Sequence, residues 1–243
     1  MNAIEIKGLC KKYRSLTAVN DLTLNVADGE MLSLLGLNGA GKTTTIKMLS
    51  CLAKPTSGDA LIYGKSIVSE PIEVKKMIGI SPQENAAAKK LTVAENLKFM
   101  CGIYGIRGEK ANENVRKMIG DFSFDKIKDR KAGSLSGGWQ KRLSIAMALI
   151  TEPKVLFLDE PTLGLDVVAR RELWSIIESL KGKMTIIITT HYLEESEHLA
   201  DRIAVMKDGE LKAYGTLDEL KSSTGENSLE EAFLKISGGN GIV

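Results

Sequence analysis

A glycine-rich stretch constrains this chain more than any other feature. Gly36 to Thr43 reads GLNGAGKT and follows directly on the apolar run Met31 to Leu35. The stretch fits the pattern G-x-x-x-x-G-K-S/T at every fixed position. Glycines let successive backbone N–H groups point inward without a Cβ in the way, and a helix that begins near Thr43 adds its positive end. The stretch therefore predicts a loop that cradles phosphates.

Two side chains of this loop complete the prediction. Lys42 supplies an ammonium for the β- and γ-phosphates of a nucleotide, and Thr43 offers a hydroxyl to Mg²⁺. The alternative is a glycine-rich turn that binds nothing, and the placing of both residues argues against it.

A pair of acidic residues supports the same chemistry. Val155 to Leu158 is an apolar run, and Asp159 and Glu160 follow it. A carboxylate at the end of a buried strand is costly unless a cation or hydrogen bonds meet it. Asp159 can hold Mg²⁺, and Glu160 can activate water as a general base. Alone, the pair would be an ordinary strand-to-loop junction, but beside a phosphate loop it indicates nucleotide hydrolysis.

The hydrophobic pattern predicts an α/β fold. Met31 to Leu35, Val155 to Leu158 and Thr185 to Thr189 are apolar on both faces, which is typical of strands buried between helix layers. Helical stretches separate them, including Thr43 to Leu52 and Val167 to Leu180. We therefore expect a P-loop ATPase core with a mostly parallel sheet.

Three further regions add to this core. In the first thirty residues apolar and polar positions alternate, which predicts an antiparallel β subdomain; the apolar positions are Ile4, Ile6, Leu22, Leu24 and Val26. Residues 202–211 read as a hairpin with Asp208-Gly209 as its turn. Residues 84–142 look mostly helical, with a capping box at Thr92 and Glu95. Two more capping boxes, Thr216/Glu219 and Ser228/Glu231, predict short helices in the tail, with a frayed end from Gly238.

Composition limits the classes of function. The net charge is only +2, so no strong basic field points to nucleic acid. Cys10, Cys51 and Cys101 have no metal-like spacing, which favours reduced thiols and a cytosolic setting. The N-terminus lacks the pattern of a secretory signal, and the longest apolar stretch, 145–150, is far shorter than the ~18 residues of a membrane span. We expect that this chain does not cross a bilayer by itself.

A third motif gives the chain its resemblance. Ser136-Gly137-Gly138 precedes a helical stretch and resembles the signature motif of ABC-type ATPases. Other positions match that family in order along nearly the whole chain: Tyr13 (adenine stacking), Asn38, Gly39, Ala40, Gly41, Lys42, Thr43 and Thr44 (Walker A), Gln83 (Q-loop), Asp159 and Glu160 (Walker B), Asp166 (D-loop) and His191 (switch histidine). Tyr13, Gln83 or His191 alone would be a weak match, whereas their order together is specific.

The resemblance implies roles for these residues. Glu160, His191 and Gln83 would be catalytic, and Thr43, Gln83 and Asp159 would hold Mg²⁺. ATP would be bound by Tyr13, the Walker A residues, Asp166 and the signature of a second subunit. Ser136 is a good N-cap, and the two glycines after it leave bare N–H groups at a helix start, which is a second anion site. The family closes such a site on ATP in a head-to-tail dimer.

One position departs from the family pattern. Position 139 is commonly glutamine in the signature, and here it is Trp139. The backbone donors from Ser136 to Gly138 survive this change, so phosphate contact should survive too. His198 has no support from the motif order and is expected to be a solvated helix residue.

The resemblance also implies a domain plan and partners. The whole chain, 1–243, would be a single ABC ATPase domain, with an α/β core over 1–82 and 147–215, a helical subdomain over 83–146 and a helical tail over 216–243. The closest resemblance is to motor subunits of bacterial exporters, which work with a membrane permease on a separate chain. The chain would then be cytoplasmic and peripheral on the inner face of the membrane, and the helical insertion would dock the permease.

Three alternatives remain open at this stage. The chain could be an importer motor, an ABC ATPase that acts on nucleic acid or in translation, or a module that binds nucleotide without hydrolysing it. The near-neutral charge argues against direct nucleic-acid contact, since the basic run 126–131 is most simply a solvated face. Glu160 argues against an inert module. The transported substrate, and whether the dimer contains two copies of this chain or a related one, do not follow from the sequence.

Overall fold

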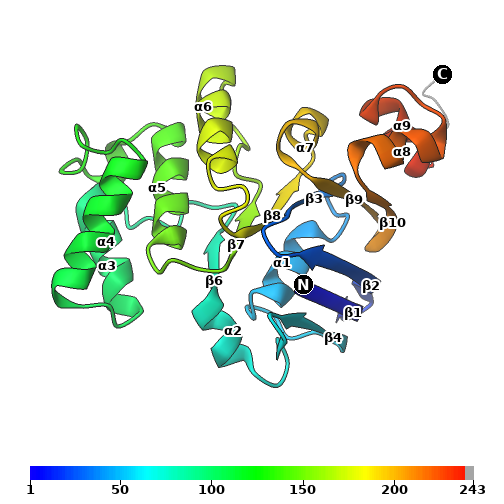
Figure 1. Ribbon diagram of the computed structural model, residues 1–243, viewed down its shortest axis with the longest axis horizontal. Helices are drawn as coiled ribbons and strands as arrows, with labels where there is room; N and C mark the ends of the chain where they lie inside the picture. The colour runs from blue at the N-terminus through cyan, green and yellow to red at the C-terminus, as the bar shows by residue number, and fades with distance from the viewer. Residues whose placement is uncertain (239–243) are drawn as a thin grey trace. The chain divides into compact units, whose positions relative to one another are not determined.

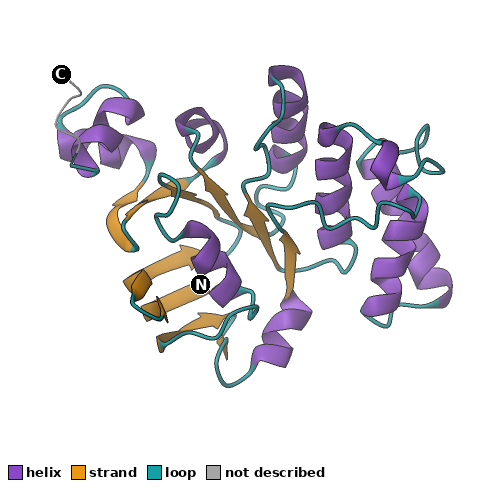
Figure 2. Ribbon diagram, turned by 180° about the vertical axis from the view of Figure 1, so that it is seen from behind, coloured by secondary structure: helices purple, strands orange, loops and turns teal. Residues whose placement is uncertain are grey.

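A computed structural model describes residues 1–238, so the predicted frayed end lies, for 239–243, outside the described residues. The chain divides into two compact units, which are described separately (Figures 1 and 2). The first unit is Met1–Met77 with Lys181–Val243, and the second is Ile78–Leu180. The boundaries of these two compact units differ from the predicted boundaries between the α/β core and the helical subdomain. That functional division remains a prediction.

The first unit contains two groups of strands. The antiparallel sheet has the order β2-β1-β4-β5. Its strands are β1 (Asn2–Tyr13), β2 (Leu16–Ala27), β4 (Ser57–Ile62) and β5 (Lys65–Ser66). In the second group β3 lies between β8 and β9 and is parallel to both, while β10 pairs antiparallel with β9. These strands are β3 (Met31–Leu35), β8 (Thr185–Thr190), β9 (Arg202–Lys207) and β10 (Glu210–Gly215).

The antiparallel β subdomain is confirmed in detail. Ile4 pairs with Val26 and Ile6 with Leu24, and all four side chains are buried. The alternation seen in the sequence therefore marks the inner face of this sheet. The hairpin is confirmed as well, because Asp208 and Gly209 both adopt positive φ, 52° and 81°, between β9 and β10.

Helices complete the first unit. They are α1 (Lys42–Leu49), α2 (Pro71–Met77), α7 (Leu193–Leu199), α8 (Leu217–Thr224) and α9 (Leu229–Ile236). The capping box at Thr216 and Glu219 is confirmed. At Ser228 the hydroxyl accepts the Glu231 N–H, but the Glu231 carboxylate meets the Ser228 hydroxyl at 3.0 Å. The second box is therefore half formed. α8 and α9 bury Leu220, Leu229 and Phe233 in one cluster with Leu35, the last residue of β3.

The second unit combines two parallel strands with helices. β6 (Ile78–Ser81) and β7 (Val155–Asp159) pair in parallel. The helices are α3 (Val93–Ile103), α4 (Gly108–Asp121), α5 (Gly137–Leu149) and α6 (Val167–Glu178), with a short 3₁₀ turn η1 (Ala132–Ser134). α3 contacts both α4 and α5, and α5 contacts α6 (Figure 1). The capping box at Thr92 and Glu95 is confirmed and starts α3.

The three apolar runs of the sequence are strands and are buried throughout. β3, β7 and β8 have no exposed residue on either face. Two predicted helices end earlier than expected, since α1 stops at Leu49 and α6 at Glu178. The positive φ of Cys51, 56°, accounts for the first, because a left-handed residue ends a helix.

One close approach sets how α5 packs in the second unit. A Cβ added to Gly79 of β6 would stand 2.3 Å from the carbonyl oxygen of Ala148 on α5. The backbones of strand and helix are therefore in contact here, and only glycine fits.

We expect Gly79→Ala to destabilise the protein by about 1–3 kcal/mol, because a buried methyl group must displace backbone. The measurement is thermal unfolding, in which each kcal/mol lowers Tm by about 2–4 °C for a chain of this size. Gly102→Ala in α3 is the control, since its Cβ would meet nothing within 4 Å. An equal Tm for Gly79→Ala and the wild type would contradict the close packing.

Candidate functional site

The glycine-rich loop lies between β3 and α1. Gly39 and Gly41 adopt positive φ, 86° and 100°. A Cβ on Gly41 would stand 2.5 Å from the carbonyl oxygen of Ala18, and a Cβ on Gly36 would stand 2.4 Å from that of Met206. Two glycines are thus required by close backbone neighbours, and the left-handed turn at Gly41 starts the helix.

The loop offers positive charge without competing acids. Gly41 is the N-cap of α1 and forms no side-chain cap, and the first turn contains no acidic residue. Lys42 is only 4% exposed, and its Nζ donates to the carbonyl oxygens of Gly36, at 2.7 Å, and Leu37, at 3.1 Å. The ammonium is therefore held inside the loop. A helix N-terminus without a side-chain cap and a fixed ammonium fit a polyphosphate.

The β9–β10 turn supports the loop from the side. The Gly209 N–H donates to the Ala40 carbonyl at 3.2 Å, and the Asn20 N–H donates to the Gly209 carbonyl at 2.8 Å. The turn is thus held between the loop and β2. The sequence marked Asp208-Gly209 as a turn only, because a contact between segments so far apart leaves no local signal.

The remaining predicted residues of the loop have different exposure. Asn38 and Gly39 are exposed at the tip, Thr43 and Thr44 are half-buried, and Ala40 is buried. A ligand at the tip could reach Asn38, Gly39 and Thr43 without displacing the core.

His191 and Tyr13 are the other predicted residues of the first unit. The Gly36 N–H donates to the Thr190 carbonyl at 3.3 Å, which brings the end of β8 to the start of the loop. His191 follows Thr190 and packs against the Tyr192 ring at 4.1 Å between centroids. Tyr13 ends β1 and is 44% exposed, with Lys11 Nζ 4.9 Å from its ring centroid. His198 lies exposed in α7, as expected.

The second unit contains the acidic pair. Asp159 ends β7 and Glu160 follows, with 4% and 7% exposure. Glu160 adopts a positive φ of 47°, which is uncommon for a residue other than glycine. Non-glycine residues with such a backbone cluster at functional sites, which agrees with the predicted role of Glu160.

The signature residues form an open helix N-terminus in the same unit. Ser136 is the N-cap of α5, but its side chain makes no capping hydrogen bond. Ser136 and Gly137 are exposed and Gly138 is half-buried, and the first turn contains no acid. A Cβ on Gly138 would stand 3.1 Å from the Ala169 Cβ. Asp166 caps α6 by accepting the Ala169 N–H at 2.9 Å, so the predicted signature and D-loop residues share one neighbour.

Trp139 packs beside the signature and leaves its backbone open. Its ring lies 6.1 Å from that of Phe124, and Arg142 lies 4.6 Å from its centroid. Arg142 also pairs with Glu172 of α6. The indole is therefore held on the side of α5, within the second unit.

Two residues that sequence reasoning missed, Gln140 and Lys141, join α5 to the segment from Gln83 to Asn85. Lys141 Nζ donates to the Gln83 carbonyl, and Asn85 Nδ2 donates to Gln140 Oε1 at 2.7 Å. Burial lowers the pKa of Lys141, and the charges of Asp159 and Glu160 oppose that change. Gln140 and Lys141 follow the signature and look like ordinary helix-surface residues, so these contacts leave no local signal.

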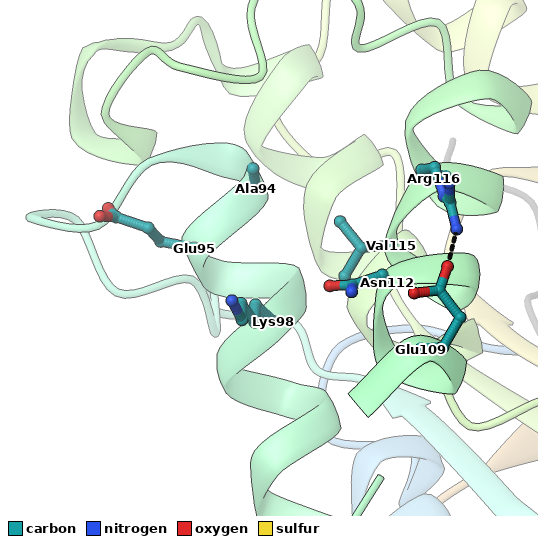
Figure 3. Close-up of a pocket in the computed structure, with 7 residues that line it drawn as sticks. All are labelled: Ala94, Glu95, Lys98, Glu109, Asn112, Val115 and Arg116. Atoms are coloured by element: carbon teal, nitrogen blue, oxygen red, sulfur yellow. Dashed lines mark hydrogen bonds and ion pairs between the residues drawn. The ribbon is translucent and has the colours of Figure 1, made fainter. Parts of the chain in front are cut away.

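A groove of about 450 Å³ lies between α3 and α4 (Figure 3). Five of its seven lining residues are polar or charged, and they include the Glu109–Arg116 ion pair. None of the predicted nucleotide or metal ligands lines it.

Comparison with known proteins gives the family. The family model described as ABC transporter matches residues 19–163. The chain belongs to the ABC transporter family. As an ATP-binding cassette of that family it hydrolyses ATP and uses Mg²⁺. Three predicted site residues, Tyr13, Asp166 and His191, lie outside the matched range.

Relatives of this ABC cassette include the daunorubicin/doxorubicin resistance ATP-binding protein DrrA of Streptomyces peucetius. The two are 42% identical over 93% of this chain and 69% of DrrA. The phospholipid-transporting ATPase ABCA3 of Rattus norvegicus is 40% identical, but the chain covers only 13% of it.

Solved structures agree with the fold. The ATP-binding subunit of an ABC transporter has a TM-score of 0.85 at 30% identity, covering 96% of this chain and 99% of that one. The cassette MJ0796, solved as a dimer in a post-hydrolysis state with ADP and Pi, has a TM-score of 0.79 at 27% identity, covering 88% and 98%. The predicted fold class is thereby confirmed.

No helix within residues 1–238 of this ABC cassette combines the length and apolar character of a bilayer span. The cysteines at 10, 51 and 101 are free thiols.

We expect Gly41→Ala to lower the free energy of unfolding by about 2–4 kcal/mol, since a left-handed alanine is strained and its Cβ meets the Ala18 carbonyl. The displaced loop should also weaken ATP binding, measured by titration with a fluorescent ATP analogue. Gly105→Ala is the control, because Gly105 has φ 73° and open space around its Cβ. Unchanged ATP affinity in Gly41→Ala would contradict the role of the turn.

Proposed function

We propose that this chain is the motor subunit of an ABC exporter, which dimerises on ATP and drives a separate membrane permease. The observation that carries the proposal is the open N-terminus of α5. Ser136 and Gly137 are exposed, uncapped and free of nearby acids in the first helical turn. One chain thus offers two sites for phosphate, the Walker A loop and the signature, which fits a dimer that shares each ATP between subunits.

Each site residue has its own role in ATP hydrolysis. The loop N–H groups and Lys42 hold the β- and γ-phosphates, and Tyr13 stacks on adenine. Mg²⁺ held by Thr43, Gln83 and Asp159 would neutralise charge on the phosphate oxygens. Glu160 accepts a proton from the attacking water as the water oxygen bonds to the γ-phosphorus and the bond to ADP breaks. His191, beside the loop in the first unit, orients the water.

The negative charge of the γ-phosphate explains why ATP would favour a dimer. The signature of one subunit gains a bound anion only when it closes on the γ-phosphate held by the other, so ATP favours the closed state over the open one. Hydrolysis and phosphate release remove that gain. The dimeric MJ0796 cassette supports this arrangement. Asp166 shares the neighbour Ala169 with the signature, which supports a role for it at the dimer contact.

Two observations support export through a separate permease. The relative DrrA is named for drug resistance, and its name describes an ATP-binding protein. α3 carries exposed apolar side chains, with Phe99 at 55% and Ile103 at 60% exposure, one helical turn apart. Such neighbours are typical of a protein contact. They support docking of the chain on a permease at the inner membrane surface.

Other functions remain as alternatives. An importer motor would use the same ATPase chemistry with another permease. An ATPase acting on nucleic acid fits less well with a net charge of +2.

We expect Glu160→Gln to bind ATP, to lose turnover by at least about 100-fold, and to form an ATP-dependent dimer seen by gel filtration. Lys42→Ala in the same background is the matched control, because it should lose nucleotide affinity and so form no dimer. A Glu160→Gln protein that turns over ATP at the wild-type rate, or stays monomeric with ATP, would contradict the proposal.

We expect the double variant Phe99→Ser, Ile103→Ser to leave host membranes. The wild-type chain should sediment with the membrane fraction, whereas loss of the apolar contact should shift the variant to the supernatant. Leu52→Ser is the control, since Leu52 is 63% exposed and lies in the first unit. If both variants sediment like the wild type, α3 does not dock the permease.

A further inference from the structure

In the second unit, one face of α5 contacts every second residue along β6 and the segment that follows it. The Ala148 carbonyl touches Gly79, Ser144 hydrogen-bonds to Ser81 at 2.8 Å, and Lys141 donates to the Gln83 carbonyl. Alternate residues of a strand share one face, as do helix residues three and four apart. The contacts therefore continue past the end of β6, so that Lys141 holds the chain where it leaves the sheet.

A second contact reinforces this attachment. Asn85 Nδ2 donates to Gln140 Oε1 at 2.7 Å, and Gln140 Nε2 donates to the Leu135 carbonyl at 2.9 Å. Leu135 directly precedes Ser136. Two successive residues of α5 thus join the Q-loop segment to the start of the signature helix. Gln140 accepts a hydrogen bond from the Asn85 side chain, and Lys141 donates one to the Gln83 backbone.

Lys141 is buried, so its ammonium needs partners inside the protein. Lys141 is 6% exposed, and a buried ammonium is costly unless it is hydrogen-bonded and near opposite charge. The Gln83 carbonyl supplies the hydrogen bond, and Asp159 and Glu160 supply negative charge. One side chain therefore hydrogen-bonds the Q-loop and lies in the negative field of both Walker B acids.

We propose that Lys141 is a positioning residue for ATP hydrolysis, which locks the Q-loop backbone to the signature helix so that the two move as one body. The proposal deepens the proposed function and rests on it. A permease that displaces the segment beginning at Gln83 would carry Ser136 to Gly138 with it, toward or away from the phosphate held by the partner subunit.

The test is Lys141→Met, which keeps the length and removes the charge. We expect the KM for ATP to stay within about twofold, because the Walker A loop lies in the other unit, while kcat falls about 10- to 100-fold through misplacement of the hydrolytic groups. In a Glu160→Gln background the same change should weaken the ATP-dependent dimer. A wild-type kcat in a folded Lys141→Met protein overturns the proposal.

Two controls separate positioning from simple destabilisation. Ser144→Ala removes the Ser81 hydrogen bond one turn further along the same face and should lower Tm by about 2–4 °C with kcat unchanged. Lys128→Met removes an exposed lysine of the same unit and should change neither. If Ser144→Ala lowers kcat as much as Lys141→Met does, the effect is general loosening of α5 and the proposal fails.

A protease measurement reports on the loop itself. Lys89 and Lys90 are exposed in the segment after Gln83, and release of that segment should speed tryptic cleavage there several-fold in Lys141→Met. Unchanged cleavage contradicts the lock. A wild-type chain without ATP turnover would refute the motor function, whereas the cleavage rates would still decide the inference.

A milder variant covers the case in which Lys141→Met does not fold. Asn85→Ala removes only the exposed contact to Gln140. We expect a kcat lowered by about threefold at unchanged KM, together with faster cleavage at Lys89 and Lys90. Wild-type values for both overturn the proposal.

Discussion

The left-handed turn at Gly41 is the constraint on which the phosphate site depends. It brings the chain from β3 into α1 against the Ala18 carbonyl, where no side chain fits. The turn leaves the N-terminus of α1 open and holds Lys42 inside the loop. Several negative charges on one ligand repel each other in water, and fixed N–H groups with an ammonium offset that repulsion. The apolar strand β3 beneath the loop, packed on the cluster of α8 and α9, keeps these groups in place.

Much of this arrangement could be predicted from local sequence. β3, β7 and β8 could be predicted because a fully apolar run indicates a buried strand without knowledge of the helices that cover it. The Asp208-Gly209 turn and two capping boxes could be predicted because their hydrogen bonds join residues close in sequence. The contacts of Gly79, Gly209 and Lys141 were not found, since each joins segments distant in the chain. The end of α1 was also missed, because nothing in the sequence around Cys51 indicates that this residue adopts a positive φ.

The candidate site shows the same division. The motif order predicts a set of site residues, and the structure adds how three parts of this set are held: the left-handed Glu160, the uncapped Ser136 and the Gln83 carbonyl at the Lys141 ammonium. The hydroxyl of Ser136 was expected to cap its helix and does not, so it stays available at the surface. Trp139 packs on Phe124 and Arg142, which explains how the signature tolerates an indole. The roles of these residues in catalysis remain predictions.

The central claim is that the signature of one subunit closes on the phosphate held by another. Disulfide cross-linking tests it directly, with Asn38→Cys and Ser136→Cys in a chain whose native cysteines at 10, 51 and 101 are replaced by serine. The account predicts a cross-linked dimer that forms rapidly with ATP in the Glu160→Gln background and not without nucleotide. Cross-linking that is absent, or that proceeds equally with and without ATP, would contradict it.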